Sequence, residues 1–264
     1  MKKMRRKIAK RSNAERAKIA RGIRNIRAAD RGYKHRIEKI GDRTAVKFWP
    51  HEWFLRRGLK DYNKRIFGIF SRENIAKLLR NELKAKRRLR ILDAGCGTCE
   101  FLGELRKLFG EKLELEGITL ARPLTVKQLE RLEKKLKEEK ALTENAKEHI
   151  ERLKKLREEF ERRVREADIK VRVGAVESYK FGKKYDVIFS VGMIVHSSNP
   201  WQALENLLNH LKKGGRAYIN FGKADILRAP ELCWRLTRQG IEIRRLSKDS
   251  YELVRRSDKP IKIT

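Results

Sequence analysis

A glycine-rich turn is the segment of this sequence best suited to chemistry. It spans residues 93–98, reads DAGCGT, and comes directly after Ile91 and Leu92, which follow a basic run. Gly95 and Gly97 permit a tight turn and let the backbone approach a ligand closely. The helix expected to follow adds free N–H groups and the positive end of its dipole. The pattern therefore predicts a nucleotide-type binding loop between a strand and a helix.

The elements that would position this loop form a regular alternation from Leu89 onward. Strands are expected at residues 88–95, 112–120, 169–176, 184–195 and 216–222, and a closing pair of strands within 241–257. Helices are expected at residues 99–110, 199–215 and 230–240. This repetition predicts an α/β fold in which a mostly parallel sheet carries helices on both faces. The closing pair predicts an antiparallel hairpin at one edge of the sheet.

Residues 122–168 form a helical insertion that is too long for a simple crossover. They hold 15 basic and 12 acidic residues, so their charge is nearly balanced. Leucines 129, 132 and 136 repeat at helical spacing, as do apolar residues at 153, 156, 160 and 164, and a bend is expected near Thr143 and Asn145. The pattern fits one long helix or a helical hairpin. Its role is either a solvated crossover or an arm that grips a substrate or partner.

Most of the positive charge lies in the N-terminal third of the chain. The formal net charge is +33, and residues 1–90 hold 31 basic and 8 acidic residues. Polyanions such as RNA, DNA or an anionic membrane surface are the expected partners. We divide the chain into a basic, partly disordered or helical arm (1–43), an aromatic and basic helical region (44–88) and the α/β domain (89–264).

Contacts with nucleic acid are expected from the arm and from the start of the second region. The predicted residues are Arg5, Arg6, Lys7, Arg11, Arg21, Arg24, Arg27, Arg56 and Arg57. Aromatic residues at positions 48, 49, 53, 54, 62, 67 and 70 either stack on bases or pack an N-terminal helix onto the core. A further helix is expected from Ser71, its N-cap, with an apolar stripe at residues 75, 78, 79 and 83.

Composition argues against a membrane-spanning, a secreted or a disulfide-rich protein. No apolar run is long enough to span a bilayer, and no apolar segment typical of a secretory signal follows the basic N-terminus. Three cysteines do not form a disulfide framework, which favours a reducing, cytoplasmic location. No metal site is expected, because Cys96 and Cys99 lack a second ligand pair. Charged residues make up 39% of the chain, which is typical of thermophilic proteins.

The segment ILDAGCGT, residues 91–98, resembles the first motif of the class I S-adenosylmethionine-dependent methyltransferases. The resemblance extends from about Leu89 to Arg256, and residues 186–220 resemble the fourth-strand region of that family. It implies a Rossmann-like sheet of seven strands with the last strand antiparallel. It also implies that the loop lies against the methionine part of S-adenosylmethionine, the cofactor.

The resemblance assigns the cofactor contacts to the loop and to the ends of the neighbouring strands. The predicted residues are Asp93, Ala94, Gly95, Cys96, Gly97, Thr119, Leu120, Val176, Glu177 and Ser190. Three positions depart from the family pattern: Cys99 replaces a glycine, Thr119 an acidic ribose ligand, and Ala175 an acidic adenine contact that Glu177 can replace. His196, just past the fourth strand, is a candidate general base.

These observations favour a methyltransferase that acts on ribosomal or transfer RNA. The basic arm would supply affinity for phosphates. Association with the ribosome or another ribonucleoprotein is expected through the same arm. Two alternatives stay open. The segment GITL, residues 117–120, is similar to that of cyclopropane-fatty-acid-synthase-like methyltransferases, which points to a small-molecule or lipid substrate. The three departures instead favour a non-catalytic RNA-binding or ribosome-associated protein with a degenerate methyltransferase fold.

Overall fold

The computed structural model describes the backbone of two N-terminal strands and nearly all of the α/β domain. The described residues are 34–40, 43–49, 57–68, 74–120, 122–138, 142, 144–194, 197, 199–221 and 230–263. The first element pair, β1 (Lys34–Ile40) and β2 (Arg43–Trp49), is an antiparallel hairpin. Residues 44–49 were expected to belong to a helical region, but four of the six, Thr44, Val46, Phe48 and Trp49, are β-branched or aromatic and favour a strand.

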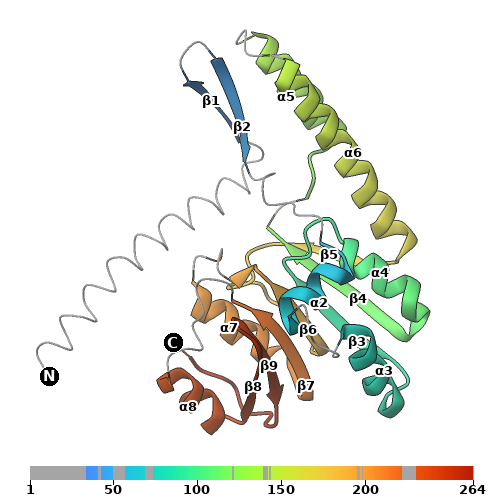
Figure 1. Ribbon diagram of the computed structural model, residues 1–264, viewed down its shortest axis with the longest axis vertical. Helices are drawn as coiled ribbons and strands as arrows, with labels where there is room; N and C mark the ends of the chain where they lie inside the picture. The colour runs from blue at the N-terminus through green and yellow to red at the C-terminus, as the bar shows by residue number, and fades with distance from the viewer. Residues whose placement is uncertain are drawn as a thin grey trace, which may run out of the picture.

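Seven strands form one sheet in the order β5-β4-β3-β6-β7-β9-β8 (Figure 1). The strands are β3 (Leu89–Ala94), β4 (Leu113–Thr119), β5 (Lys170–Val173), β6 (Tyr185–Val191), β7 (Leu211–Asn220), β8 (Ile241–Ser247) and β9 (Ser250–Arg255). Only β9 runs antiparallel to its neighbours, β7 and β8. The expected Rossmann-like, mostly parallel sheet is therefore confirmed, as is the antiparallel closing pair.

Helices cover both faces of the sheet, with a separate apolar core under each layer (Figure 1). One layer holds α2 (Leu59–Phe67), α3 (Ile75–Ala85), α4 (Glu100–Phe109) and the lower part of α6 (Glu144–Glu166). The other holds α7 (Pro200–Asn209) and α8 (Pro230–Arg238). A short 3-10 helix, η2 (Gly110–Lys112), follows α4. No helix of the described part combines the length and apolarity needed to cross a bilayer.

Helix α2 is built into the domain at both of its ends. Its N-terminal residue is Leu59, whose N–H donates to the carboxylate of Glu104 on α4. At the other end, Ser250 Oγ donates to the carbonyl of Arg65 at 2.6 Å. Tyr62 and Phe67 lie in the core beneath this helix. The core-packing alternative therefore holds for these two aromatic residues, while residues 53, 54 and 70 lie outside the described part.

Helix α3 begins at Ile75, so its N-cap lies three residues later than the expected N-cap, Ser71. Asn74 is its N-cap, and its side chain accepts a bond of 2.8 Å from the N–H of Lys77. Asn63 on α2 accepts the N–H of Ile75 at 2.8 Å, which joins the two helices. Asparagine caps helices as well as serine does, so local sequence alone did not distinguish the two starts.

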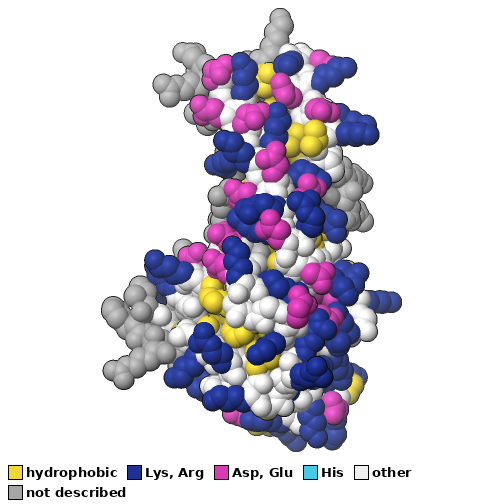
Figure 2. All heavy atoms as spheres, turned by 90° about the vertical axis from the view of Figure 1, so that its right-hand side faces the viewer, with side chains coloured by type: hydrophobic (Ala, Val, Ile, Leu, Met, Phe, Trp, Pro, Cys, Tyr) yellow, Lys and Arg dark blue, Asp and Glu magenta, His cyan; other side chains and the backbone are white. Residues whose placement is uncertain are grey.

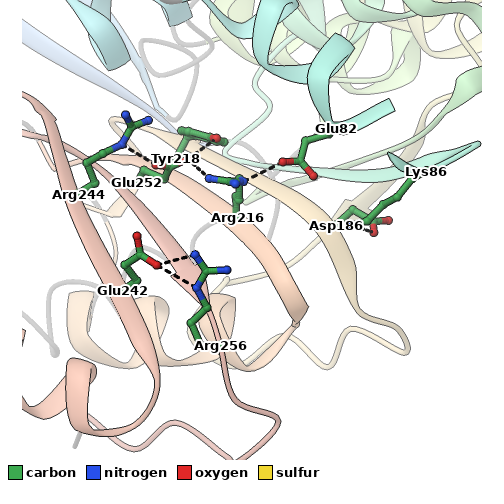
Figure 3. Close-up of polar contacts among 9 residues, drawn as sticks. All are labelled: Glu82, Lys86, Asp186, Arg216, Tyr218, Glu242, Arg244, Glu252 and Arg256. Carbon is green, nitrogen blue, oxygen red and sulfur yellow. Dashed lines mark hydrogen bonds and ion pairs between the residues drawn. The ribbon is translucent and has the colours of Figure 1, made fainter. Parts of the chain in front are cut away.

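A partly buried polar network fixes α3 to the sheet (Figure 3). Arg216 on β7 donates to Glu82 of α3 at 2.8 Å and to Glu252 of β9 at 2.7 Å. Tyr218 also donates to Glu252 at 2.7 Å. Burial raises the pKa of Glu252, but the bonds from Tyr218 and Arg216 outweigh it and hold that pKa below its usual value. The carboxylate of Glu82 therefore pairs with Arg216 of the sheet and not with the cations beside it on α3.

The insertion is a helical hairpin, one of the two expected forms. Helix α5 (Val126–Glu138) packs against the first part of α6 through a small apolar core, and the pair projects from the body of the domain (Figure 1). Ala146, Ile150 and Leu153 of α6 contribute to that core. Farther along α6, Phe160 packs on the sheet core. One helix thus serves both as the crossover and as half of the projecting hairpin.

The segment between α7 and β7 differs from expectation. The helix ends at Asn209 and the strand starts at Leu211, whereas residues 211–215 were expected to close the helix. The pairing passes from Tyr185–Leu211 to Val187–Arg216, so the residues between bulge out of the ladder. Gly214 has a φ of 77°, a conformation that favours glycine and explains the bulge.

Candidate functional site

The glycine-rich turn lies at the edge of the sheet where β3, β4, β5 and β6 end side by side. Gly95 and Gly97 have φ angles of 95° and 49°. The N–H groups of Gly95 and Cys96 donate to the carbonyl of Ile118 at 2.8 and 3.2 Å, which ties the turn to β4. A Cβ added at Gly95 would lie 2.6 Å from Met193 Cβ. Glycine is therefore required at this position by both conformation and space.

The unusual Cys99 adopts the conformation for which the family uses glycine. Its φ of 57° is left-handed, and it is the N-cap of α4 without a capping side-chain bond. Cys96 packs against Gly117 of β4, where a Cβ would lie only 2.6 Å from Cys96 Sγ. The two thiols are buried 3.6 Å apart. Cys99 thus adopts the left-handed backbone conformation that glycine would adopt at this position of the turn.

Asp93 lies beneath α2 rather than on an open surface. Tyr62 Oη donates to both of its carboxylate oxygens, at 2.9 and 3.0 Å. The Tyr62 ring stacks on Phe101 of α4 with ring centres 3.9 Å apart. Burial raises the pKa of Asp93 to about 7, although Tyr62 and Arg57 act in the opposite direction. Tyr62 thereby holds the C-terminal end of β3 in place from the side of the sheet that α2 covers.

Arg57 also belongs to this site. Its Nη1 donates to the carbonyl of Val191 at 2.8 Å, where β6 ends, and it lies against Gly192. Burial lowers its pKa. The predicted contact of Arg57 with nucleic acid stays a prediction, but this side chain reaches the strand ends and is not part of an open basic surface. The other eight predicted nucleic-acid contacts, Arg5, Arg6, Lys7, Arg11, Arg21, Arg24, Arg27 and Arg56, lie outside the described residues.

The remaining predicted cofactor residues surround the same sheet edge. Ala94 ends β3, Thr119 ends β4 and is followed by Leu120, Val176 and Glu177 are buried in the turn after β5, and Ser190 is buried in β6. Their contacts with a cofactor stay predictions. His196 lies outside the described residues. Tyr62 and Met193 were not predicted as parts of the site, because no pattern in the sequence near them indicates a contact with the turn.

The residues present fit S-adenosylmethionine. Gly95 and Gly97 both have positive φ angles, so the turn exposes backbone rather than side chains, as a loop that binds a cofactor closely requires. The hydroxyls of Thr98 and Ser190 are buried without a hydrogen-bond partner among the described residues, which leaves polar groups for a ligand near the turn. No group of three or more metal-binding side chains occurs in the described part.

The sequence from residue 62 to residue 239 matches the model of the methyltransferase domain family. The chain belongs to this family. The match confirms the resemblance stated above, and residues 62–239 belong to a methyltransferase domain. The match begins at Tyr62, so it includes part of α2. The methyltransferase also has no significant sequence match among curated proteins.

Several solved methyltransferases are similar in structure. A TehB-like SAM-dependent methyltransferase from Corynebacterium glutamicum is 20% identical, with a TM-score of 0.38, over 67% of this chain and 83% of that chain. CalS10, an amino pentose methyltransferase from Micromonospora echinaspora, is 18% identical, with a TM-score of 0.32, over 55% and 48%. Coclaurine N-methyltransferase is 14% identical, with a TM-score of 0.33, over 55% and 33%. The methyltransferase therefore spans half or less of the last two chains.

Proposed function

We propose that this methyltransferase acts on RNA, with ribosomal or transfer RNA as the substrate. The observation that carries the proposal is the net charge of +33, most of which lies in residues 1–90, ahead of and at the start of the catalytic domain. A polyanion is the partner that such a charge attracts. The cation-rich arm would bind phosphates without regard to sequence, and the site would choose the target.

Methyl transfer requires alignment of the acceptor atom with the methyl group more than it requires a strong base. S-adenosylmethionine, when bound, supplies a methyl group on a positively charged sulfur that is already reactive. The turn at Gly95 and Gly97 would hold the cofactor by its backbone, while Met193 limits the space above the turn. Tyr62 and Arg57 brace the ends of β3 and β6. The chain's contribution is therefore to bring the acceptor atom into line with the methyl group.

Cofactor binding is the first test. We expect S-adenosylmethionine to bind the purified full chain saturably in a calorimetric titration. Gly95→Arg should weaken that binding at least 100-fold, because a Cβ already collides with Met193 and the positive φ disfavours a side chain. Gly182→Arg is the matched control, since nothing lies within 4 Å of a Cβ there. Absence of saturable binding to the unaltered chain would contradict the enzymatic activity.

The substrate is tested by transfer of labelled methyl groups. We expect label in ribosomal or transfer RNA fractions, and a yield that falls steeply as salt is raised. Label in a lipid or small-molecule extract, with none in RNA, would instead favour the alternative suggested by residues 117–120. The Gly95→Arg chain serves as the blank, because it removes the cofactor site and leaves the basic residues in place.

A further inference from the structure

We propose that the exposed side of α3 and the loop after it form a phosphate-binding ridge for the RNA substrate. The basic ridge consists of Lys77, Arg80, Lys84, Arg87 and Arg88. All five side chains are exposed. The inference rests on the proposed function and names a surface of the described domain, separate from the arm, that would hold the RNA backbone.

The ridge cations have no acidic partner among the described residues. The one acidic side chain on α3, Glu82, is bound by Arg216. The cations that do have partners nearby, Lys86 and Arg90, pair with Asp186 and Glu114 and are not part of the ridge. Within the described part of the chain, no carboxylate therefore neutralises these five positive charges. An uncompensated row of cations is the arrangement that attracts a polyanion.

The helical hairpin shows the opposite arrangement. Along α5 and α6, cations pair with carboxylates three or four residues away, as in the pairs of Lys137 with Glu133, Lys147 with Glu144 and Lys154 with Glu151. Figure 2 shows both arrangements on one face: Lys and Arg alternate with Asp and Glu over the projecting hairpin, while Lys and Arg dominate the lower body, where Figure 1 places α3. Among the residues that the structure describes, the basic ridge thus differs from the hairpin in having cations without paired carboxylates.

Three of the ridge residues lie on a regular helix, and the Lys77 end of the ridge is the end next to the helix that supports the site. Lys77, Arg80 and Lys84 are spaced three and four residues apart, so they lie on one side of α3 over about 10 Å. Asn63 of α2 binds the first turn of α3, next to Lys77. Helix α2 in turn carries Tyr62, which contacts Asp93 beside the glycine-rich turn. A backbone of phosphates on the ridge would thus pass close to the helix that supports the cofactor loop.

The chemistry of α3 favours RNA over a membrane surface. A helix that binds a bilayer inserts apolar side chains between the lipid headgroups. The apolar residues of α3 face the domain instead: Ile75 and Leu79 are fully buried, and Leu78 and Leu83 pack against the core. The exposed side thus offers charge with no apolar anchor, which suits the phosphates of a soluble polyanion.

A matched pair of full-length variants tests the ridge. The ridge variant carries Arg80→Gln, Lys84→Gln, Arg87→Gln and Arg88→Gln. The control variant carries Lys137→Gln, Lys147→Gln, Lys154→Gln and Arg162→Gln, which removes the same charge from paired cations of the hairpin. Binding of polyuridylate, of an RNA duplex and of phosphatidylserine vesicles is measured by fluorescence anisotropy or sedimentation over a range of salt concentrations. S-adenosylmethionine titration verifies that each variant is folded.

We expect the ridge variant to bind RNA at least tenfold more weakly, with a slope of log K against log salt that is smaller by about 3. The control should keep the slope of the unaltered chain. An unchanged slope in the ridge variant, while the unaltered chain binds RNA, overturns the ridge and leaves the RNA substrate standing. Binding to vesicles but not to RNA overturns the RNA substrate itself, as does failure of the unaltered chain to bind RNA at low salt.

Discussion

Replacing Arg255 with methionine should lower the free energy of unfolding by about 3–5 kcal/mol. The Arg255 side chain is 1% exposed, and its guanidinium donates to six carbonyl groups at 2.7 to 3.2 Å. Those of Leu208 and Asn209 belong to the last turn of α7, where carbonyls lack partners within the helix. Methionine fills much of the volume but leaves these buried oxygens unpaired.

The neighbouring Arg256→Met is the matched control. Its guanidinium pairs with Glu242, and both side chains are more than half exposed (Figure 3). Exposed ion pairs contribute little, so we expect a loss of no more than about 1 kcal/mol. Urea unfolding of both variants at one pH gives the comparison. Equal losses at positions 255 and 256 would show that the bonds to the carbonyl groups do not hold α7 and the C-terminal segment together.

The sheet and the binding loop were predictable because their signals are local. The almost wholly apolar segment 184–195 predicts a strand buried on both faces, and every residue of β6 is indeed buried. The glycines at 95 and 97 mark a turn by their own conformational freedom. The alternation of elements restricts the topology to few choices, which is why a mostly parallel sheet with helices on both faces followed from the pattern, while the number of seven strands came from the family resemblance.

The supports of the site could not be predicted in the same way. Glu104 caps α2 from another helix, and no residue near position 59 indicates that partner. Tyr62 is 31 residues away from Asp93, and its aromatic, basic surroundings fit base stacking equally well. The charge of Arg57 suggested a contact with nucleic acid, and nothing near it in the sequence indicated that its side chain reaches the end of β6. Such contacts depend on packing between elements, which local patterns do not encode.

The helix that these contacts hold connects the site with the proposed RNA surface. One side of α2 carries Tyr62 against Asp93, and Asn63 on the same helix accepts the N–H of Ile75 in the first turn of α3, where the basic ridge begins. The ends of α2 are fixed by Glu104 and Ser250, so it has little freedom to move separately from the sheet. A molecule held along α3 is therefore placed at a fixed distance from the cofactor loop, which is what positioning of an acceptor atom requires.

Asp93→Asn should make the protein more stable at pH 8 by up to about 4 kcal/mol, with little effect near pH 4. Burial raises the pKa of Asp93 to about 7, from an ordinary value of 3.8. A carboxyl group with a raised folded pKa binds more protons when folded, so its contribution to stability is full below pH 4. That contribution is lost as the pH rises to 7. Asparagine keeps the acceptor for Tyr62 and cannot ionise, so the loss disappears.

The measurement is urea unfolding of the unaltered chain and of Asp93→Asn at several pH values between 4 and 8, because all other groups are common to both and cancel in the difference. Tyr62→Phe is the companion variant: its hydroxyl holds the pKa of Asp93 down, so removing it should steepen the loss of stability with rising pH. Parallel pH profiles for all three chains would mean that Asp93 is ionised in the folded protein at every pH tested. In that case Tyr62 would be bracing a carboxylate, and the cofactor loop would carry a buried negative charge directly behind it.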